Sequence, residues 1–445
     1  TIRGVSNADT TEKGDPSAAF MLDGIYIARP QDQNVSFHDL ARVEVLRGPQ
    51  GTLYGRNATA GVVNVISNAP VQRLEGAVGA GAGDYGSRKA NAMINVPLSP
   101  ALAVRAALAY NRHDSYLVNA QGTPHRLGLD RDDQSARLSA RLAIGQAASL
   151  LVRHDRSTVN DNSDSIVPDT NFYTGVASGA PAWREGGTEQ RLTNSFVPPN
   201  VVPAQGFSDK TSSGTTAELT FKLGAATLSW LGSHRNYEHN ALANFYYRVA
   251  PAFALGVRQD FSGEYAQDSH ELRIAANAGP LAMQGGLYYF REESDVVYAF
   301  RDLELVGLPP YYVFPHGPTI ARSRAVFGQA TYSVNDALRI TAGARYTEDD
   351  KSRVGSTNFQ QTREFNPATD FRLLNAATLG TRKTTWRIGA EYDLAPSTFV
   401  YATVSTGYKA GGFNDGCLAG TRALGIDCPA ALAVPATTLF YQPEH

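Results

Sequence analysis

Apolar and polar residues alternate along most of the chain beyond residue 70. In residues 134–145, for example, Leu138 has the parity of the apolar residues and Arg137 has the opposite parity. Residues 338–347 and 386–394 repeat this pattern. A period of two predicts β-strands that carry one apolar face. About a dozen such segments of roughly 10–14 residues follow one another, a length that suits tilted strands crossing a membrane.

The charged residues of these segments share one parity, opposite to that of the large apolar residues. We therefore expect them on the inner face of one curved antiparallel sheet, with the apolar residues outside. The prediction places inside Arg137, Arg141, Arg339, Arg345, Arg387 and Glu391, and places outside Leu138, Ile340 and Ile388.

The connections between the segments alternate in length. Tight turns rich in Gly, Pro, Asn and Asp follow every second segment, and long connections follow the others. The long connections span residues 115–133, 159–212, 239–263, 296–321 and 351–382, and the chain from 410 onward. This alternation is typical of outer-membrane β-barrels and not of soluble β-sandwiches.

Residues 1–70 follow a different pattern. A turn-rich stretch at 47–56 precedes the β-branched run 62–66, which predicts a strand. Two short helices are predicted, at Ala18–Leu22 and at 37–41. We therefore divide the chain into an N-terminal α+β domain, residues 1–70, and a β-barrel domain, residues 71–445.

Composition and charge exclude several classes of protein. Forty Lys and Arg against 42 Asp and Glu give a net charge of −2, which excludes a generally basic nucleic-acid binder. No run of about 18 apolar residues exists, which excludes helical membrane spans but not a barrel, whose strands hide their apolar half by alternation. Residues 1–4 are no secretory signal and residues 441–445 resemble the middle of a loop, so we expect a fragment or a processed chain.

Motifs for catalysis or metal binding find no support. Residues 81–86 match G-x-G-x-x-G, but the alternating residues after them predict a strand, so we interpret the glycines as a hairpin rather than a dinucleotide site. The polar stretch 160–169 lacks the glycine and the terminal glutamate of a calcium loop and is interpreted as a solvated loop. We expect no enzyme activity, no cofactor and no bound metal.

The two cysteines, Cys417 and Cys428, lie in one Gly- and Ala-rich loop. Their closeness and this context favour a local disulfide in an oxidising compartment. The alternative is a pair of unrelated free thiols.

Residues 43–67 closely resemble the plug domain of TonB-dependent outer-membrane receptors. Three further stretches match the same family in order: residues 2–4 with 23–24, residues 327–332 with 343–349, and residues 407–414. The resemblance implies an all-β-dominated fold, a transmembrane antiparallel β-barrel of 22 strands around an N-terminal α+β plug. About 12–13 of those strands are expected in this chain. The TonB box is expected before Thr1, and the last strands after residues 441–444.

The resemblance also implies roles for plug residues. Arg3 and Arg47 match two plug arginines that pair with barrel carboxylates, whose partners we expect beyond His445; the alternative for both is local hydrogen bonding to the backbone. Gly48, Gly51 and Gly55 flank Tyr54 in the motif and let the plug backbone turn tightly.

The function implied by the resemblance is import of a scarce, large solute, driven by the proton-motive force through TonB. A ferric siderophore is the first expectation for this cargo, and haem, cobalamin, an oligosaccharide or an aromatic compound are alternatives. A passive porin, a signalling transducer and a soluble secreted β-protein are the other hypotheses.

The expected partners are TonB with its inner-membrane complex, a small metal chelate or other nutrient, and outer-membrane lipid with lipopolysaccharide. We expect no nucleic acid, and a monomer in the outer membrane of a Gram-negative bacterium. We expect the cargo to contact the plug apex and the long loops. Within them we select aromatic residues and an arginine with its polar neighbours, because aromatic rings and forked cations suit flat anionic ligands. They are Arg29, Gln31, Asn34, Tyr173, Trp183, Tyr246, Tyr247, Tyr311 and Tyr312.

Overall fold

A 13-stranded antiparallel sheet dominates the computed structural model. The structure describes residues 12–33, 38–119, 128–162, 192–194, 205–250, 253–303, 309–441 and 443; for 33, 117–119, 192–194, 244–250 and 253–257 it describes the backbone alone. Within these ranges, no helix has the length and apolar character needed to cross a membrane.

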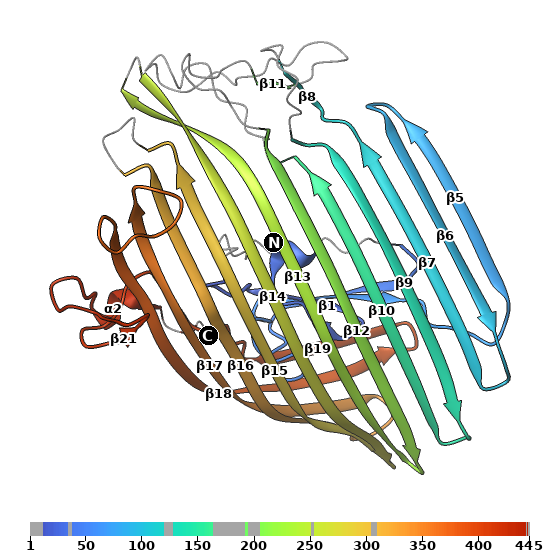
Figure 1. Cartoon of the computed structure of the whole chain (residues 1–445). Helices are drawn as coiled ribbons and strands as arrows, with labels where there is room; N and C mark the ends of the chain where they lie inside the picture. The colour runs from blue at the N-terminus through green and yellow to red at the C-terminus, as the bar shows by residue number, and fades with distance from the viewer. Residues whose placement is uncertain are drawn as a thin grey trace.

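The 13 strands form a curved wall, here called the barrel wall, in which each strand pairs with its neighbours in chain order (Figure 1). Strands β5 and β19 are its two edges. The number of strands agrees with the prediction. The wall consists of β5 (Glu75–Gly83), β6 (Ser87–Pro97), β7 (Leu102–His113), β9 (Arg131–Ile144), β10 (Ala148–Asp161), β12 (Phe207–Leu223), β13 (Ala226–Ala250), β14 (Phe253–Ala278), β15 (Leu281–Arg301), β16 (Tyr311–Ser333), β17 (Leu338–Gln360), β18 (Phe371–Ala395) and β19 (Thr398–Ser405).

Strands β13 to β18 are longer than predicted, at 21 to 26 residues each. Most of the residues predicted as long loops at 239–263, 296–321 and 351–382 continue the strands instead. Tyr298 pairs with Phe314, and Phe359 pairs with Phe371, in these extensions. Cross-strand aromatic pairs stabilise a sheet without any lipid around it, so the strands extend past the membrane-spanning length that we assumed.

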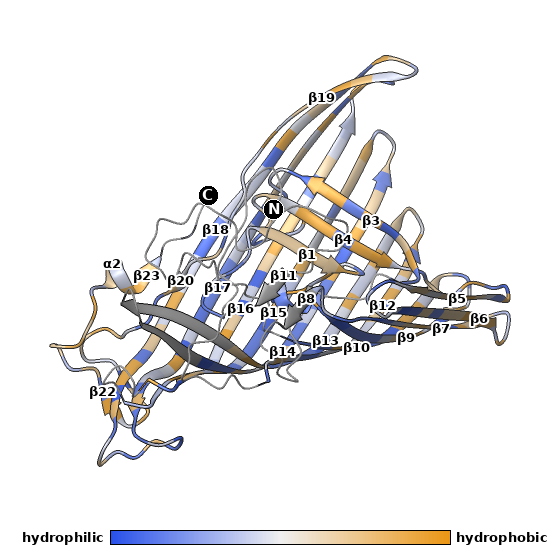
Figure 2. Ribbon diagram, turned by 90° about the horizontal axis from the view of Figure 1, so that it is seen from above, coloured by the Kyte–Doolittle hydropathy of each residue, from blue (hydrophilic) through white to orange (hydrophobic). Residues whose placement is uncertain are grey.

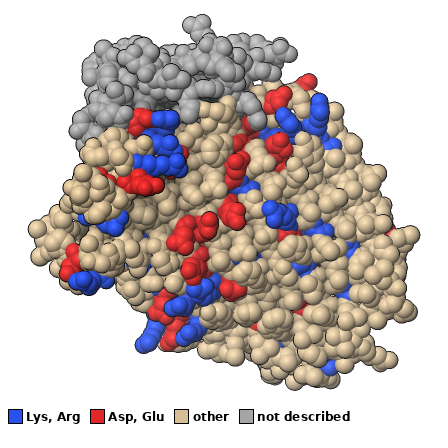
Figure 3. All heavy atoms as spheres, viewed as in Figure 1, with Lys and Arg blue, Asp and Glu red and all other residues tan. Residues whose placement is uncertain are grey.

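The predicted division into two faces is confirmed. Arg137 and Arg345 are buried on the concave side, which we call the lumen, whereas Leu138 and Ile388 are 59% and 56% exposed on the outside. Arg141, Arg339, Arg387 and Glu391 share the lumenal parity. Figure 3 shows the outer face, where charged side chains gather in patches and broad areas, including most of the lower right, carry none.

Tight turns connect the strands at one end of the wall. The predicted hairpin at residues 81–86 lies at the opposite end, beside the long connection that follows β7: β5 and β6 meet there at Tyr85 and Gly86, both with positive φ, and Asp114 donates its N–H to the carbonyl of Tyr85. Gly145, Gly224 and Gly279 also have positive φ at tight turns, a conformation that glycine adopts without strain. The long connections lie at the other end (Figure 1).

The N-terminal domain, here called the plug, lies on the concave side of the wall (Figure 2). Its sheet has the order β2-β1-β4-β3, with β1 and β4 parallel. A 3₁₀ turn, η1 (Pro30–Gln33), follows β2. The strands are β1 (Ala18–Leu22), β2 (Ile25–Tyr26), β3 (Leu40–Arg47) and β4 (Gly61–Ser67).

Both predicted plug helices are wrong. Ala18–Leu22 is strand β1, and Leu40 already belongs to β3, while residue 37 lies outside the described residues. β1 is almost fully buried because it pairs with β2 on one side and β4 on the other. Pairing partners distant in the sequence therefore override the local preference of this short segment. The predicted strand at 62–66 is confirmed within β4.

Short elements complete the fold. β8 (Leu117–Asn119) pairs in parallel with β11 (Leu192–Asn194). The C-terminal part contains β20 (Gly412–Phe413), β21 (Arg422–Ala423), β22 (Ile426–Asp427), the one-turn helix α2 (Ala436–Leu439) and β23 (Phe440–Tyr441). β20 pairs with β23, and β21 with β22.

Candidate functional site

Buried ion pairs hold the plug against the barrel wall. Each pair joins one plug residue to one wall residue, and every side chain in them is less than 10% exposed. In the described part of the chain, the pairs that involve an arginine or a lysine are Asp15–Lys351, Asp23–Arg153, Arg29–Glu292, Asp39–Arg105 and Arg56–Asp349. A buried charge without a partner is costly, so the pairs favour one seating of the plug.

The Arg29–Glu292 pair is bidentate and lies where the plug backbone meets β14 and β15. Nε of Arg29 donates to one carboxylate oxygen of Glu292, and Nη2 donates to the other at 2.5 Å. Beside them, Gln267 accepts from the backbone N–H of Ala28 and donates to the carbonyl of Tyr26. Burial alone would lower the pKa of Arg29, but the Glu292 carboxylate raises it above its ordinary value.

The surroundings of Arg29 differ from the predicted ones. We expected Arg29 to face an open cavity, whereas it is 4% exposed and its guanidinium lies 5.8 Å from the ring centre of Tyr265. Gln31 is half-buried in η1. Asn34, Tyr173 and Trp183 lie outside the described residues, as do the side chains of Tyr246 and Tyr247. Direct contacts of these residues with a cargo stay predictions.

Asp32, in η1, is a buried acid at the wall of β12 and β13. Burial raises its pKa to about 6, although Arg235 and a hydrogen bond with Ser212 favour the ionised form. Arg235 is itself held by Asp155, with two hydrogen bonds of 2.9 Å. Asp32 is therefore an acid whose pKa is raised inside the plug–wall interface.

The glycines of the plug motif differ in what surrounds them. Gly55 has φ +84°, and a Cβ there would lie 2.8 Å from the guanidinium of Arg345. Gly48 has φ +82° but open space around it. Gly51 lies against the wall, where a Cβ would be 3.3 Å from that of Thr385. Tyr54, half-buried, packs on the core cluster that joins the plug to Phe290.

Of the two motif arginines, only Arg47 lies in the described part of the chain. Arg47 is exposed and makes no ion pair with any described residue, and Arg3 lies outside the described residues. Their pairing with barrel carboxylates stays a prediction. Among the described plug residues, the arginines that pair with the wall are Arg29 and Arg56, whose partners are 263 and 293 residues away in the sequence.

Residues 407–414, which matched the family in sequence, contact the plug motif. Asn57, fully buried with φ +64°, donates its N–H to the carbonyl of Tyr408 and accepts from the N–H of Ala410. Ser405 donates to the carbonyl of Pro49. The two motifs therefore form one interface.

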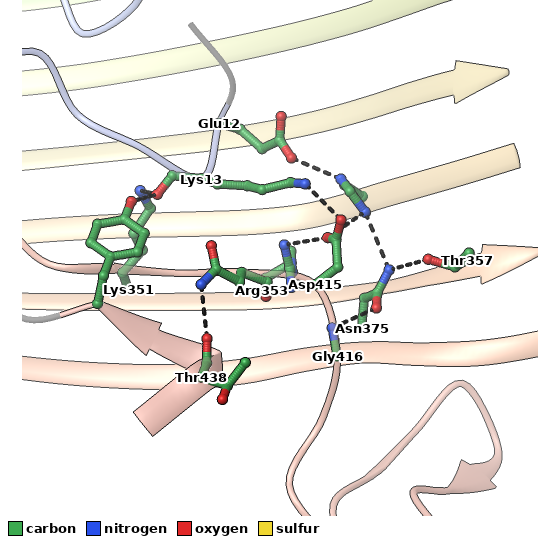
Figure 4. A network of polar contacts seen from close by, with 12 residues as sticks. Glu12, Lys13, Lys351, Arg353, Thr357, Asn375, Asp415, Gly416 and Thr438 are labelled. Carbon is green, nitrogen blue, oxygen red and sulfur yellow. Dashed lines mark hydrogen bonds and ion pairs between the residues drawn. The ribbon is translucent and has the colours of Figure 1, made fainter. Parts of the chain in front are cut away.

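A second polar network centres on Asp415 (Figure 4). Its carboxylate contacts Lys13 Nζ at 2.8 Å, Arg353 Nη1 at 3.3 Å and His316 Nε2 at 3.4 Å. The other ring nitrogen of His316 lies 2.8 Å from Glu12. Beyond Asp415, Cys417 and Cys428 form a disulfide, in the loop where the sequence placed both cysteines. The start of the described plug is thereby linked to the disulfide loop, residues 417–428.

Aromatic rings line the lumen above the plug, across β13 to β18. Neighbouring rings in this set have centroids 4.2–6.4 Å apart. We call the set the aromatic arc; it comprises Tyr237, His239, Phe261, Tyr265, Tyr298, Phe300, Tyr312, Phe314, His316, Phe359 and Phe371. Of the predicted cargo contacts, Tyr312 belongs to the arc, and Tyr311 is its half-buried neighbour in the chain.

Two cavities flank these features. One of about 450 Å³ lies between β16–β18 and the disulfide loop and includes Tyr312, Phe314, Phe371 and Arg372 in its lining. The other, of about 240 Å³, lies between the plug and the wall and is lined by Tyr54, Glu218, Glu271, Arg273 and Arg345 among others. Within the described ranges, no three His, Cys, Asp or Glu side chains gather as a metal site.

Two protein-family models match the chain. The model described as "TonB dependent receptor-like, beta-barrel" matches residues 145–426, and the "TonB-dependent Receptor Plug Domain" matches residues 1–62. The chain belongs to the TonB-dependent receptor family. The receptor is accordingly an outer-membrane β-barrel protein of a Gram-negative bacterium, in a family of transport receptors that are not known as enzymes.

Curated relatives and solved structures agree with this assignment. The pesticin receptor of Yersinia pestis is 25% identical over 430 residues, which cover 93% of this chain and 55% of that protein. The chain thus spans about half the length of the curated relatives it matches. The ferric enterobactin receptor PirA of Pseudomonas aeruginosa is 39% identical over 83 residues, 17% of this chain and 11% of PirA.

Among solved structures, the ferric yersiniabactin uptake receptor FyuA of Yersinia pestis has a TM-score of 0.77 at 20% identity, covering 95% of this chain and 60% of that one. The siderophore receptor PiuA of Acinetobacter baumannii has a TM-score of 0.72 at 13% identity, covering 99% of this chain and 64% of that one. These likenesses show that the fold is shared.

Sequence reasoning missed the partners of the plug charges and the aromatic arc. The lumenal parity of Glu292 and Gln267 was readable from strand alternation, but which plug residue each would meet was not. The arc escaped notice because most of its residues lie in the segments that we took for loops; Tyr237 and Tyr265 lie just outside them.

Proposed function

We propose that the receptor imports a ferric siderophore whose iron ligands are carried on aromatic rings, with TonB supplying the energy. The aromatic arc above the seated plug carries this proposal, because stacked rings offer flat, partly buried faces to an aryl ligand. The names of similar proteins support it: FyuA is a ferric yersiniabactin uptake receptor, and PirA is a ferric enterobactin receptor. Tyr312 is the proposed contact from the predicted set.

Energised transport is favoured over passive diffusion. A porin lumen is open to water, whereas here the plug is fixed to the wall by five buried ion pairs. Passage then requires work on the plug, and TonB is the partner that the family implies for it. We further propose that the receptor works as a monomer whose apolar outer face contacts lipid and lipopolysaccharide.

Uptake measurements test the proposal. Cells that carry the receptor in their outer membrane are given radioactive iron bound to a catecholate, a phenolate or a hydroxamate chelator. We expect uptake of an aryl chelate, its loss when TonB is deleted, and unchanged binding at the cell surface. Equal uptake without TonB would identify a passive pore. Uptake of only hydroxamate iron, haem, cobalamin or an oligosaccharide would retain the transport mechanism and overturn the proposed cargo.

A further inference from the structure

The lumenal residues of β14 and β15 form a ladder that runs from the aromatic arc down past the plug. The register pairs Phe261 with Tyr298, and six residues further along β14 it pairs Gln267 with Glu292. The pairs Ser269–Phe290, Glu271–Tyr288 and Arg273–Gly286 follow toward the tight-turn end. Aromatic rings, an ion pair and a polar cavity are therefore stacked in this order along one side of the plug.

At the level of Gln267 and Glu292, the plug fills the space between itself and the wall. Arg29 fills it and binds Glu292 with both arms of its guanidinium, and the side chains of the pair are 4% and 3% exposed. Gln267 holds the adjoining plug backbone at Tyr26 and Ala28. Above this level the ring of Tyr265 faces the guanidinium of Arg29 at 5.8 Å.

Below the closed level the wall and the plug separate. The cavity of about 240 Å³ begins beside Tyr26 and Tyr288 and reaches Ser229 and Arg273, close to the tight turns of β13 and β14. Arg273 and Glu218 are each more than 40% exposed at that end, so the cavity opens toward the periplasmic side.

In the described part of the chain, the plug is closely packed where it meets β18 and the residues after β19. At β18, a Cβ on Gly51 would lie 3.2 Å from a side-chain carbon of Thr385 and 3.1 Å from the carbonyl oxygen of Thr406. A Cβ on Gly407 would lie 2.9 Å from the side chain of Thr59. The plug backbone itself touches the wall there, and close-packed backbones do not part for a solute without moving the whole domain.

We infer that cargo crosses toward the periplasm along the β13–β15 side of the plug and that the Arg29–Glu292 pair is the gate of this route. The inference deepens the proposed function and rests on it. An anionic aryl chelate that leaves the arc meets Arg29 first, and its oxyanions compete with Glu292 for the same forked donor. Below the gate, Arg345 lies 5.2 Å from the ring centre of Tyr288, a second cationic and aromatic surface for the same chemistry.

Two buried hydroxyl residues give a matched pair of reporters. Ser269 lies just below the gate on β14 and is 3% exposed; Thr385 lies on β18 against Gly51 and is 3% exposed. Neither hydroxyl has a hydrogen-bond partner in the described part of the chain, so Ser269→Cys and Thr385→Cys remove no such bond. The native cysteines are joined in the disulfide and do not compete for a thiol probe.

The experiment measures labelling of each cysteine in intact cells by a hydrophilic maleimide too large for porins. The gate is neutralised by Arg29→Gln with Glu292→Gln, which leaves two amides able to hydrogen-bond. We expect labelling of Ser269→Cys to rise about tenfold, because a loss of 1.4 kcal/mol from a closed state multiplies its open population by ten. Labelling of Thr385→Cys should stay unchanged.

A rise at both cysteines would show general loosening of the plug and overturn the gate, as would no rise at Ser269→Cys. Should the double variant not reach the outer membrane, Arg29→Lys replaces it, which keeps the charge but loses the fork and should raise labelling at Ser269→Cys alone. The labelling needs no cargo, so a receptor that fails to take up any ferric chelate would refute the proposed function without deciding the route.

Discussion

The wall groups that lie against a plug residue determine its pKa if it is charged, and the cost of substituting it if it is a glycine with positive φ. Gly55 and Gly48 have nearly the same φ, yet only Gly55 lies under a guanidinium. Asp32 and Asp39 are both acids of the plug, yet burial raises the pKa of Asp32, whereas hydrogen bonds from Arg105 and Asn68 outweigh burial and lower that of Asp39. Residue type alone does not determine either behaviour.

Gly55→Ala and Gly48→Ala separate backbone strain from steric conflict. A left-handed alanine costs roughly 1–2 kcal/mol, and we expect Gly48→Ala to lower the free energy of unfolding by about that amount. Gly55→Ala should cost more, because its Cβ would lie 2.8 Å from Arg345. Thermal unfolding of the detergent-solubilised receptor measures both. Equal losses would show that Arg345 moves aside freely.

The raised pKa of Asp32 predicts that its effect on the stability of the receptor depends on pH with the opposite sign to that of most acids. Its pKa is 3.8 in the unfolded chain and about 6 in the folded one, so the folded state binds more protons between these values. The contribution of Asp32 to the free energy of unfolding therefore falls as pH rises from about 4 to 6. The fall is about 3 kcal/mol, because the two pKa values differ by about two units. Asp32→Asn should remove this fall and stabilise the receptor at pH 7. Measured free energies of unfolding that change with pH in the same way in the parent and in Asp32→Asn would contradict the raised pKa of Asp32.

At the scale of elements, alternation decides the faces of each strand and tertiary contacts decide its length. Strands β13 to β18 continue past the predicted ends because the arc residues pair across them. The disulfide loop packs its two cysteines on Leu374 and Ala376 of β18, which ties it to the wall.

Loss of the disulfide should make this loop more mobile and leave the barrel wall folded. The bond closes a loop with a sequence separation of 11, for which the chain-entropy model gives stabilisation of roughly 2–3 kcal/mol. We expect Cys417→Ser with Cys428→Ser to be cleaved faster by protease between residues 418 and 427 on intact cells. The control is the parent receptor treated with a reductant, which should be cleaved as fast as the double variant. If both resist the protease, the packing of the loop on Leu374 is enough to hold it without the disulfide.

At the scale of the whole molecule, the ion pairs couple two domains that are continuous in sequence but meet through distant residues. They surround the plug from β7 to β17, so its seating depends on many wall strands at once. Work applied to the plug must break such contacts before a path opens.

The Asp39–Arg105 pair offers a test of this seating. Arg105 donates to both oxygens of Asp39, at 2.8 and 2.5 Å, with both side chains buried. Arg105→Met should lower the free energy of unfolding by about 3 kcal/mol, because Asp39 keeps a buried charge without its main partner. Arg105→Met with Asp39→Leu should recover much of the loss. Removing the exposed pair Arg422–Asp427 is the control, for which we expect little change.

The sequence by itself determined the class of fold, the number of wall strands, the faces of those strands and the hairpin at 81–86. These features depend on local periodicity and turn chemistry, which neighbouring residues carry between them. The motif at 43–67 likewise located the plug, and the loop shared by Cys417 and Cys428 favoured their pairing.

Only the tertiary structure decided that residues 18–22 form a strand, that the arc is paired sheet, and that Arg29 meets Glu292. Each of these depends on contacts between distant parts of the chain: Ala19 of β1 pairs with Val62, and Arg29 and Glu292 are separated by 263 positions. A buried arginine requires a carboxylate, but any lumenal acid meets that requirement until the plug is seated. The choice among them is made by the geometry of the whole wall.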